Sequence, residues 1–98
     1  MDMSQIMEKA QQFQQKMAAM QGEMAQKKVS RTVGGGMVSV IVNGNNELLE
    51  LKIDKEVINP DEPEMLQDLI VAAVNDAMKE AKEMMQAELE ILVNKLSV

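Results

Sequence analysis

Two stretches, residues 3–27 and 64–96, constrain this chain most, because both have the composition of long helices. Neither contains Pro, and their only glycine is Gly22. At 1.5 Å per residue the first helix would be about 37 Å long and the second up to about 50 Å. A compact globule of 98 residues has a diameter of only about 32 Å. We therefore expect both helices to project from the body of the protein as arms.

The first stretch carries apolar residues at alternating spacings of three and four, which is the a/d pattern of a coiled coil. The residues between them are Gln, Lys, Glu and Ala, which all favour helices. We interpret the methionines in this seam as packing residues. The alternative is a Met-rich groove for partners or a membrane, and the weak positive charge and the lack of Trp disfavour the membrane version. The seam consists of Met3, Ile6, Ala10, Phe13, Met17, Met20 and Met24.

The middle of the chain predicts three antiparallel strands, at residues 28–33, 37–42 and 47–53. The run Gly34-Gly35-Gly36 predicts a turn with positive φ, which glycine adopts readily. Asn43-Gly44 predicts a type I′ hairpin turn, lengthened by Asn45 and Asn46. In the third strand Leu49, Leu51 and Ile53 alternate with Glu50 and Lys52, so the meander should have one apolar face.

The second helical stretch changes its pattern along its length. It follows a break at residues 59–63, whose acids favour a helix start. Its first half has a broad apolar face suited to covering the sheet, and its second half has a narrower seam suited to another helix. The first set is Leu66, Leu69, Ile70, Ala73, Val74 and Ala77, and the second is Met85, Leu89, Leu92 and Leu96.

A partner would resolve the exposure of these seams. One Phe is the only aromatic residue, so the core of one protomer should be thin. A symmetric second copy could cover the arms and the free sheet edges, and C2 is the commonest arrangement. We predict one α+β domain over residues 1–98, built as α-β-β-β-α, that forms a homodimer. The predicted dimer or helix seam comprises Ile6, Phe13, Met17, Met20, Met24, Met85, Leu89 and Leu92.

Residue types needed for most catalysis are missing. The chain has no His and no Cys, so it lacks the usual general base, a cysteine nucleophile and a thiolate metal site. Its carboxylates do not follow the EF-hand spacing, and its triple glycine does not fit a nucleotide-binding motif, although a backbone anion nest is the alternative to a turn there. We expect no enzyme activity, no cofactor and no metal. The chain offers no membrane-spanning run or signal peptide, so we expect the cytoplasm.

The charge is unevenly distributed. The net charge is −6, but residues 1–33 carry five basic and three acidic groups (+2), and residues 34–98 carry five and thirteen (−8). Nucleic-acid contacts would therefore have to be local. Lysines that flank a helix seam are ordinarily exposed to solvent without a specific role. The alternative hypothesis is that they contact phosphates of a nucleic acid. The candidate contacts are Lys9, Lys16, Lys27, Lys28, Arg31, Lys79, Lys82 and Lys95.

Three segments together resemble a known family. They are Gly36-Met37-Val38-Ser39-Val40-Ile41-Val42-Asn43-Gly44, Leu49-Glu50-Leu51-Lys52-Ile53-Asp54, and Leu66 through Ala77 with the sequence LQDLIVAAVNDA. In this combination and order the chain resembles the YbaB/EbfC family of bacterial nucleoid-associated proteins over nearly its whole length. The resemblance implies a tweezers-like homodimer that binds DNA through the ends of its helical arms, usually with low sequence specificity. It also implies a location in the nucleoid and a role in nucleoid organisation or gene regulation.

Two functions follow as hypotheses. The first is a dimer that binds duplex DNA through backbone contacts, because Arg31 is the only arginine and no base-reading array is present. The second is a helical module that binds another protein, for example one of replication or recombination. Salt response separates them, because phosphate binding weakens steeply as salt rises and an apolar interface does not.

Overall fold

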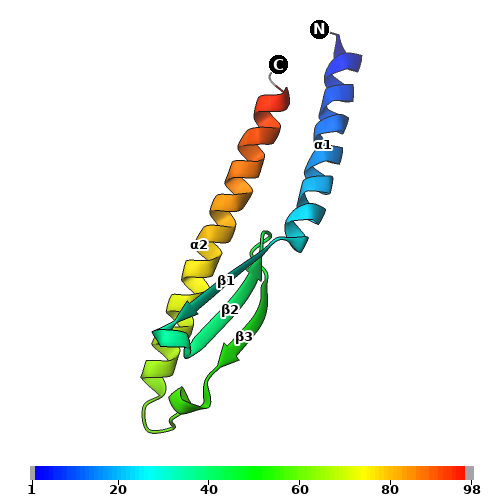
Figure 1. Cartoon of the computed structure of the whole chain (residues 1–98). Coiled ribbons are helices and arrows are strands. Elements are labelled where there is room, and N and C mark those ends of the chain that lie inside the picture. Colours follow the sequence, from blue (N-terminus) through cyan, green and yellow to red (C-terminus); the bar gives the residue numbers. More distant parts are fainter. Residues whose placement is uncertain (1, 97–98) are drawn as a thin grey trace.

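The computed structural model describes residues 2–96, which form an elongated α+β protomer (Figure 1). The predicted order α-β-β-β-α is confirmed. Its extents are 68 × 18 × 17 Å and its radius of gyration is 19.3 Å, well above the roughly 12.6 Å of a compact chain of this length. The elements are α1 (Met3–Gln26), β1 (Lys28–Val33), η1 (Gly34–Gly36), β2 (Val38–Asn43), β3 (Leu48–Ile53), η2 (Lys55–Val57) and α2 (Pro63–Leu96).

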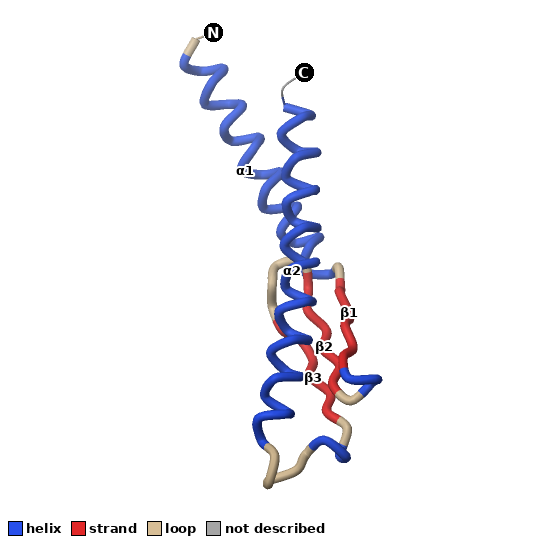
Figure 2. Tube along the Cα trace, turned by 90° about the vertical axis from the view of Figure 1, so that its left-hand side faces the viewer, coloured by secondary structure: helices blue, strands red, loops and turns tan. Residues whose placement is uncertain are grey.

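The helices extend past the sheet in the same direction. α2 runs along one face of the sheet and continues beyond it, and α1 projects from the same end, so both termini lie at that end (Figures 1 and 2). The two helices are antiparallel and diverge toward their free ends (Figure 2). We call the part of the molecule beyond the sheet the arm. No helix of the described chain is long and apolar enough to cross a membrane.

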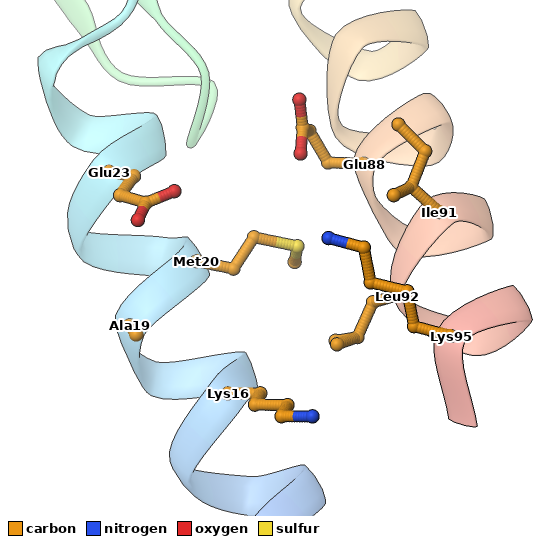
Figure 3. Close-up of a pocket in the computed structure, with 8 residues that line it drawn as sticks. All are labelled: Lys16, Ala19, Met20, Glu23, Glu88, Ile91, Leu92 and Lys95. Atoms are coloured by element: carbon orange, nitrogen blue, oxygen red, sulfur yellow. The ribbon is translucent and has the colours of Figure 1, made fainter.

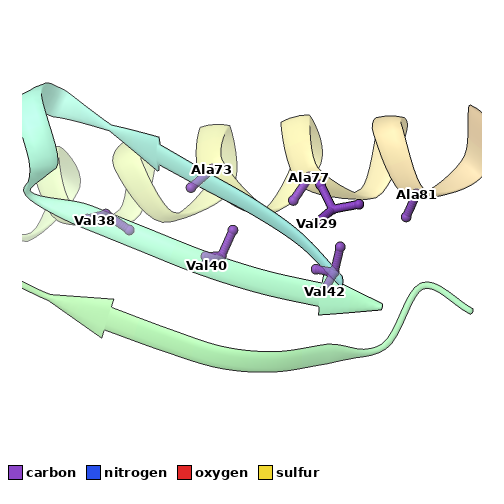
Figure 4. Close-up of a cluster of buried hydrophobic side chains, with 7 residues drawn as sticks. All are labelled: Val29, Val38, Val40, Val42, Ala73, Ala77 and Ala81. Atoms are coloured by element: carbon purple, nitrogen blue, oxygen red, sulfur yellow. The ribbon is translucent and has the colours of Figure 1, made fainter. Parts of the chain in front are cut away.

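The main core lies between α2 and the first two strands (Figure 4). Three alanines on α2, spaced four apart, face valines of β1 and β2. Alanine has no side chain beyond Cβ, so the helix can lie close to the sheet. The buried residues of this core are Val29, Val38, Val40, Val42, Ala73, Ala77 and Ala81.

The helix leaves the third strand uncovered. The strand order is β1-β2-β3, all antiparallel, and α2 packs against β1 and β2 rather than β3. Leu51 pairs with Val40 and therefore shares its face, yet Leu51 remains 40% exposed. A bulge at Ile41/Val42 interrupts the predicted alternation, so that Leu48 rather than Leu49 pairs with the buried Val42, and Leu48 is 45% exposed. The apolar face predicted for the meander thus continues beyond the cover that one protomer supplies.

Of the two turns predicted for the meander, one is observed as expected and the other has a different geometry. The predicted glycine turn is confirmed, with φ of 62°, 68° and 99° at Gly34, Gly35 and Gly36. The predicted type I′ turn at Asn43-Gly44 is wrong. Asn43 still belongs to β2, and the one non-glycine residue with positive φ in the described chain is Asn46, at 62°. The predicted lengthening by Asn45 and Asn46 is confirmed, because β3 begins only at Leu48.

Gly44 is required for close approach to α1. Its backbone N–H donates to the carbonyls of Met24 and Lys27 at 2.9 and 3.0 Å. A Cβ on Gly44 would lie 2.8 Å from the Met24 carbonyl oxygen, which is closer than real Cβ atoms come. The hairpin therefore joins the last turn of α1 directly, and we call residues 43–45 the latch.

Asparagine side chains complete the latch. Asn45 Nδ2 donates to the Gln21 carbonyl at 2.9 Å, and Asn43 Nδ2 reaches the Ala25 carbonyl at 3.5 Å. Asn43 Oδ1 also accepts from the backbone N–H of Asn45 and of Glu47, each at 3.0 Å. The carbonyls of Met24 and Ala25 lie in the last turn of α1, where no i+4 donor exists within the helix, so the latch supplies them with donors.

A second core, rich in methionine, holds the base of the arm. Met20, Met24 and Leu92 are its buried members, and Met24 is 1% exposed. Around them pack Phe13, Met17, Met84, Met85 and Leu89. Ile6, predicted in the same seam, is 47% exposed, because α1 has diverged from α2 at that level. The outer part of the α1 seam thus has no cover within the described protomer.

We predict that Gly44→Ala lowers the free energy of unfolding by about 1–3 kcal/mol, because the added methyl overlaps backbone that cannot move freely. Urea unfolding followed by circular dichroism would measure it. Gly22→Ala is the matched control, since nothing lies within 4 Å of its Cβ position. In an open helix position this change should stabilise by up to about 1 kcal/mol. Equal effects at the two glycines would contradict the role of the latch.

Candidate nucleic-acid interface

Two of the candidate cations are neutralised within the protomer. Lys27 Nζ lies 3.1 Å from Glu88 Oε1. Arg31 Nε lies 3.2 Å from Asp76 Oδ2, and its guanidinium also pairs with Glu80. Both side chains therefore tie the region where α1 meets the sheet to α2.

Arg31 is directed to these acids by strand alternation. Val29 is buried against α2, and Arg31, two residues later on β1, occupies the same face. Asp76 and Glu80 are four apart and so share one side of the helix. Each immediately precedes a core alanine, Ala77 or Ala81. The sequence shows that these two acids and the core alanines recur every four residues. Only the structure shows that Arg31 of β1 lies beside the acids of α2.

The other candidate lysines are unpaired within residues 2–96, where the structure gives them no ion pair. They fall in three places. Lys9, Lys16 and Lys95 lie on the arm, and Lys28 opens β1. Lys79 and Lys82 lie on α2, turned about 200° and 140° from Ala77 at 100° per residue. Lys79 therefore projects from the outer face of α2, opposite the sheet, and Lys82 from the edge of that face, toward the side that carries Met78. Both are exposed.

Lys16 and Lys95 come together across the two helices. They line a pocket of about 300 Å³ with Ala19, Met20, Glu23, Glu88, Ile91 and Leu92. Figure 3 shows both ammonium groups turned toward the space between α1 and α2. Neither has an ion-pair partner among the described residues. The sequence places these lysines on separate helices nearly eighty residues apart, so only the fold joins them.

The charges of this pocket are ordered along the arm. Lys16 precedes Glu23 by seven residues on α1, and Glu88 precedes Lys95 by seven on α2. Because the helices are antiparallel, both lysines lie toward the free end and both glutamates toward the sheet. On α1 the apolar residue Met20 lies between the two charges, whereas on α2 the Lys95 side chain reaches back past Leu92 toward Glu88 (Figure 3). We call this surface the arm face.

The opposite end of the molecule is acidic. Residues 54–68 contain six acidic groups and one basic group, Lys55. They form η2, the loop that follows it and the start of α2, at the end of the sheet away from the arm (Figure 1). This end would repel a polyanion. The arm differs in that its unpaired lysines alternate with acidic groups such as Glu8, Glu23 and Glu90, so its charge is mixed.

Comparison with known proteins now decides the family. Residues 1–96 match the family described as the YbaB/EbfC DNA-binding family. The chain belongs to the YbaB/EbfC DNA-binding family. The resemblance inferred from the three sequence segments is thus confirmed.

Relatives of this YbaB/EbfC protein are similar to it in sequence over most of its length. A nucleoid-associated protein of Syntrophobacter fumaroxidans is 47% identical over 92 residues, which cover 94% of this chain and 84% of that one. A nucleoid-associated protein of Clostridium acetobutylicum is 44% identical over 97 residues, or 99% and 87% of the two chains. The crystal structure of an uncharacterized protein from Helicobacter pylori superposes with a TM-score of 0.88 at 27% identity, covering 95% of this chain and 98% of that one. The sequence comparisons thus identify the family, and the solved structure from Helicobacter pylori has the same fold as this chain.

We predict that Arg31→Gln reduces stability by about 0.5–1 kcal/mol, because it removes two partly exposed ion pairs. The loss should shrink in about 1 M salt, where such pairs are screened. Urea unfolding at low and high salt would measure both. Lys28→Gln removes an unpaired charge three residues earlier and should change stability by less than about 0.5 kcal/mol. A loss at Arg31 that is unaffected by salt would argue against an ionic role.

Proposed function

We propose that this protein binds duplex DNA as a homodimer, through phosphate contacts made by its arms and with low sequence specificity, and that it acts in the nucleoid, in its organisation or in gene regulation. The family supports DNA as the partner. The observation that carries the finer proposal is the contrast between unpaired lysines on the arm and an acidic opposite end. The arm is the part of the molecule where a phosphate backbone meets cations free to bind it.

Lys9, Lys16 and Lys95 are the contacts we propose first. Lys16 and Lys95 face one space from two helices, and Lys9 lies two helical turns farther toward the free end of α1. Lys28, Lys79 and Lys82 are exposed and unpaired in the described chain, and we retain them as flanking contacts. Lys27 and Arg31 are held by carboxylates, so we assign them to the stability of the protomer.

Low specificity follows from the residue types. Lysine binds phosphate as a point charge, whereas base readout favours the planar fork of arginine or the amides of Asn and Gln in the major groove. The single arginine of the chain is engaged with α2. Phosphate contacts orient a protein on the duplex without reading its sequence.

The homodimer is supported by an uncovered apolar surface beside α2. Asp76 and Glu80 lie over β1 through Arg31, so the opposite side of α2 faces the β3 edge. That side carries Val71, which is 57% exposed. We call this surface the dimer face, and its residues are Leu48, Leu51, Val71, Val74 and Met78. It is self-complementary in kind, since each copy offers one apolar strand and one apolar helix side.

We predict that Leu51→Glu weakens the homodimer by roughly tenfold or more, because two carboxylates would be buried near the symmetry axis. Sedimentation equilibrium would measure the dissociation constant, and circular dichroism would verify that the protomer stays folded. Met3→Glu is the control, because it adds the same charge at an exposed apolar residue near the free end of α1. A dimer that withstands Leu51→Glu would remove β3 from the interface.

The DNA proposal predicts a linear fall of log affinity with log salt on random-sequence duplex DNA. Combining Lys9→Gln, Lys16→Gln and Lys95→Gln should weaken binding and reduce the slope by roughly 0.9 for each phosphate that the variant no longer neutralises. Fluorescence anisotropy across a salt series would measure both. Lys55→Gln removes one charge at the acidic end that has no ion pair within residues 2–96, and it should leave the slope unchanged. If the triple variant keeps the original slope, the arm is not the DNA-binding surface.

The second candidate function is a helical module for protein partners, for example of replication or recombination. The exposed apolar residues Met3, Ile6 and Met7 near the free end of α1 favour it. They could enter a groove of a partner as helical anchors. Failure of the intact dimer to bind DNA even at low salt would favour this candidate.

A further inference from the structure

We propose that the arm face is a self-association surface, on which the arms of two copies of this chain pair antiparallel about a two-fold axis. Such a contact is separate from the dimer face and from DNA binding. It rests on the order of charges and apolar residues in the pocket between α1 and α2.

The charge order makes the arm face complementary to itself. On each helix the lysine and the glutamate are seven residues apart, with the lysine nearer the free end. Two arm faces that meet antiparallel therefore place Lys16 opposite Glu23 of the second copy. The same operation places Lys95 opposite Glu88. Each contact occurs twice, as a closed two-fold interface requires.

The same charges disfavour the other two-fold arrangement, in which the two arms are parallel. If two arm faces met parallel, α1 would lie against α2 of the second copy. Lys16 would then face Lys95, and Glu23 would face Glu88. Like charges directly opposed across an interface disfavour it. The pocket therefore specifies one orientation rather than a general tendency to associate.

Small and apolar residues occupy the position of the axis. The midpoint between Lys16 and Glu23 falls between Ala19 and Met20, and that between Glu88 and Lys95 falls between Ile91 and Leu92. All four line the pocket. Ala19 permits close approach of two backbones, and Ile91, which is 49% exposed, would be covered. An apolar centre with charged ends is the usual composition of a protein interface.

The chain offers a clean test because it has no cysteine. Ala19→Cys places one thiol beside the proposed axis, where facing helices bring their Cα atoms into disulfide range. Ala18→Cys is the matched control, an exposed alanine turned about 100° around the same helix. With diamide at low salt and no DNA, we expect a covalent dimer of Ala19→Cys on a non-reducing gel and little of Ala18→Cys. Equal cross-linking of the two, or none, would overturn the proposal.

Charge reversal supplies the second arm of the test. Adding Lys16→Glu to Ala19→Cys opposes two glutamates at each end and should lower cross-linking about tenfold. Adding Glu23→Lys as well restores opposite charges and should restore the cross-link. Failure of this restoration would overturn the pairing. The restored variant still lacks Lys16, so weakened DNA binding alongside recovered cross-linking would separate this proposal from the proposed function.

Discussion

The arm of this protein depends on the contact between one hairpin and the last turn of α1. Elsewhere α1 packs mainly on the methionine cluster it shares with α2, and its outer part has no cover within the described protomer. The Gly44 N–H and the Asn45 amide bind carbonyls of α1, and the absent side chain of Gly44 lets the two backbones meet. This contact fixes the direction in which α1 leaves the sheet. The position of Lys16 relative to Lys95 follows from that direction.

The charges available for binding depend on which side chains form ion pairs within the protomer as well as on the net charge. The chain is acidic overall, and several of its acids are used within the protomer, where Asp76, Glu80 and Glu88 hold Arg31 and Lys27. The cations left over lie largely on the arm and the outer face of α2. A polyanion approaching the arm therefore meets free lysines, although the net charge opposes it. The same lysines serve the proposed self-association, so DNA and a second arm would compete for them.

The cores explain why one copy is incomplete. Alanines on α2 allow a close fit to two valine-bearing strands, but such a narrow helix cover cannot also reach β3. The strand keeps its apolar face, and a side of α2 next to it stays apolar as well. In the arm, flexible methionines fill the space between diverging helices, which suits a surface whose geometry changes along its length. Both regions thus present apolar surface for another molecule.

Local pattern in the sequence was enough to predict the elements and their order, and the resemblance of three segments to a known family predicted the family. Helix periodicity, strand alternation and the glycine turn act over a few residues, and the bounds observed for α1, the strands and α2 lie within one residue of those expected.

Tertiary structure alone decided three other matters. It replaced the type I′ geometry expected at Asn43-Gly44, because these residues bind carbonyls of α1. It neutralised Arg31 and Lys27 while leaving Lys16 and Lys95 without ion pairs in the described chain. It also left Ile6 exposed, since a heptad seam states which residues can pack but not how far the partner helix follows. Each of these depends on contacts between residues distant in the chain, whose distances no local pattern contains.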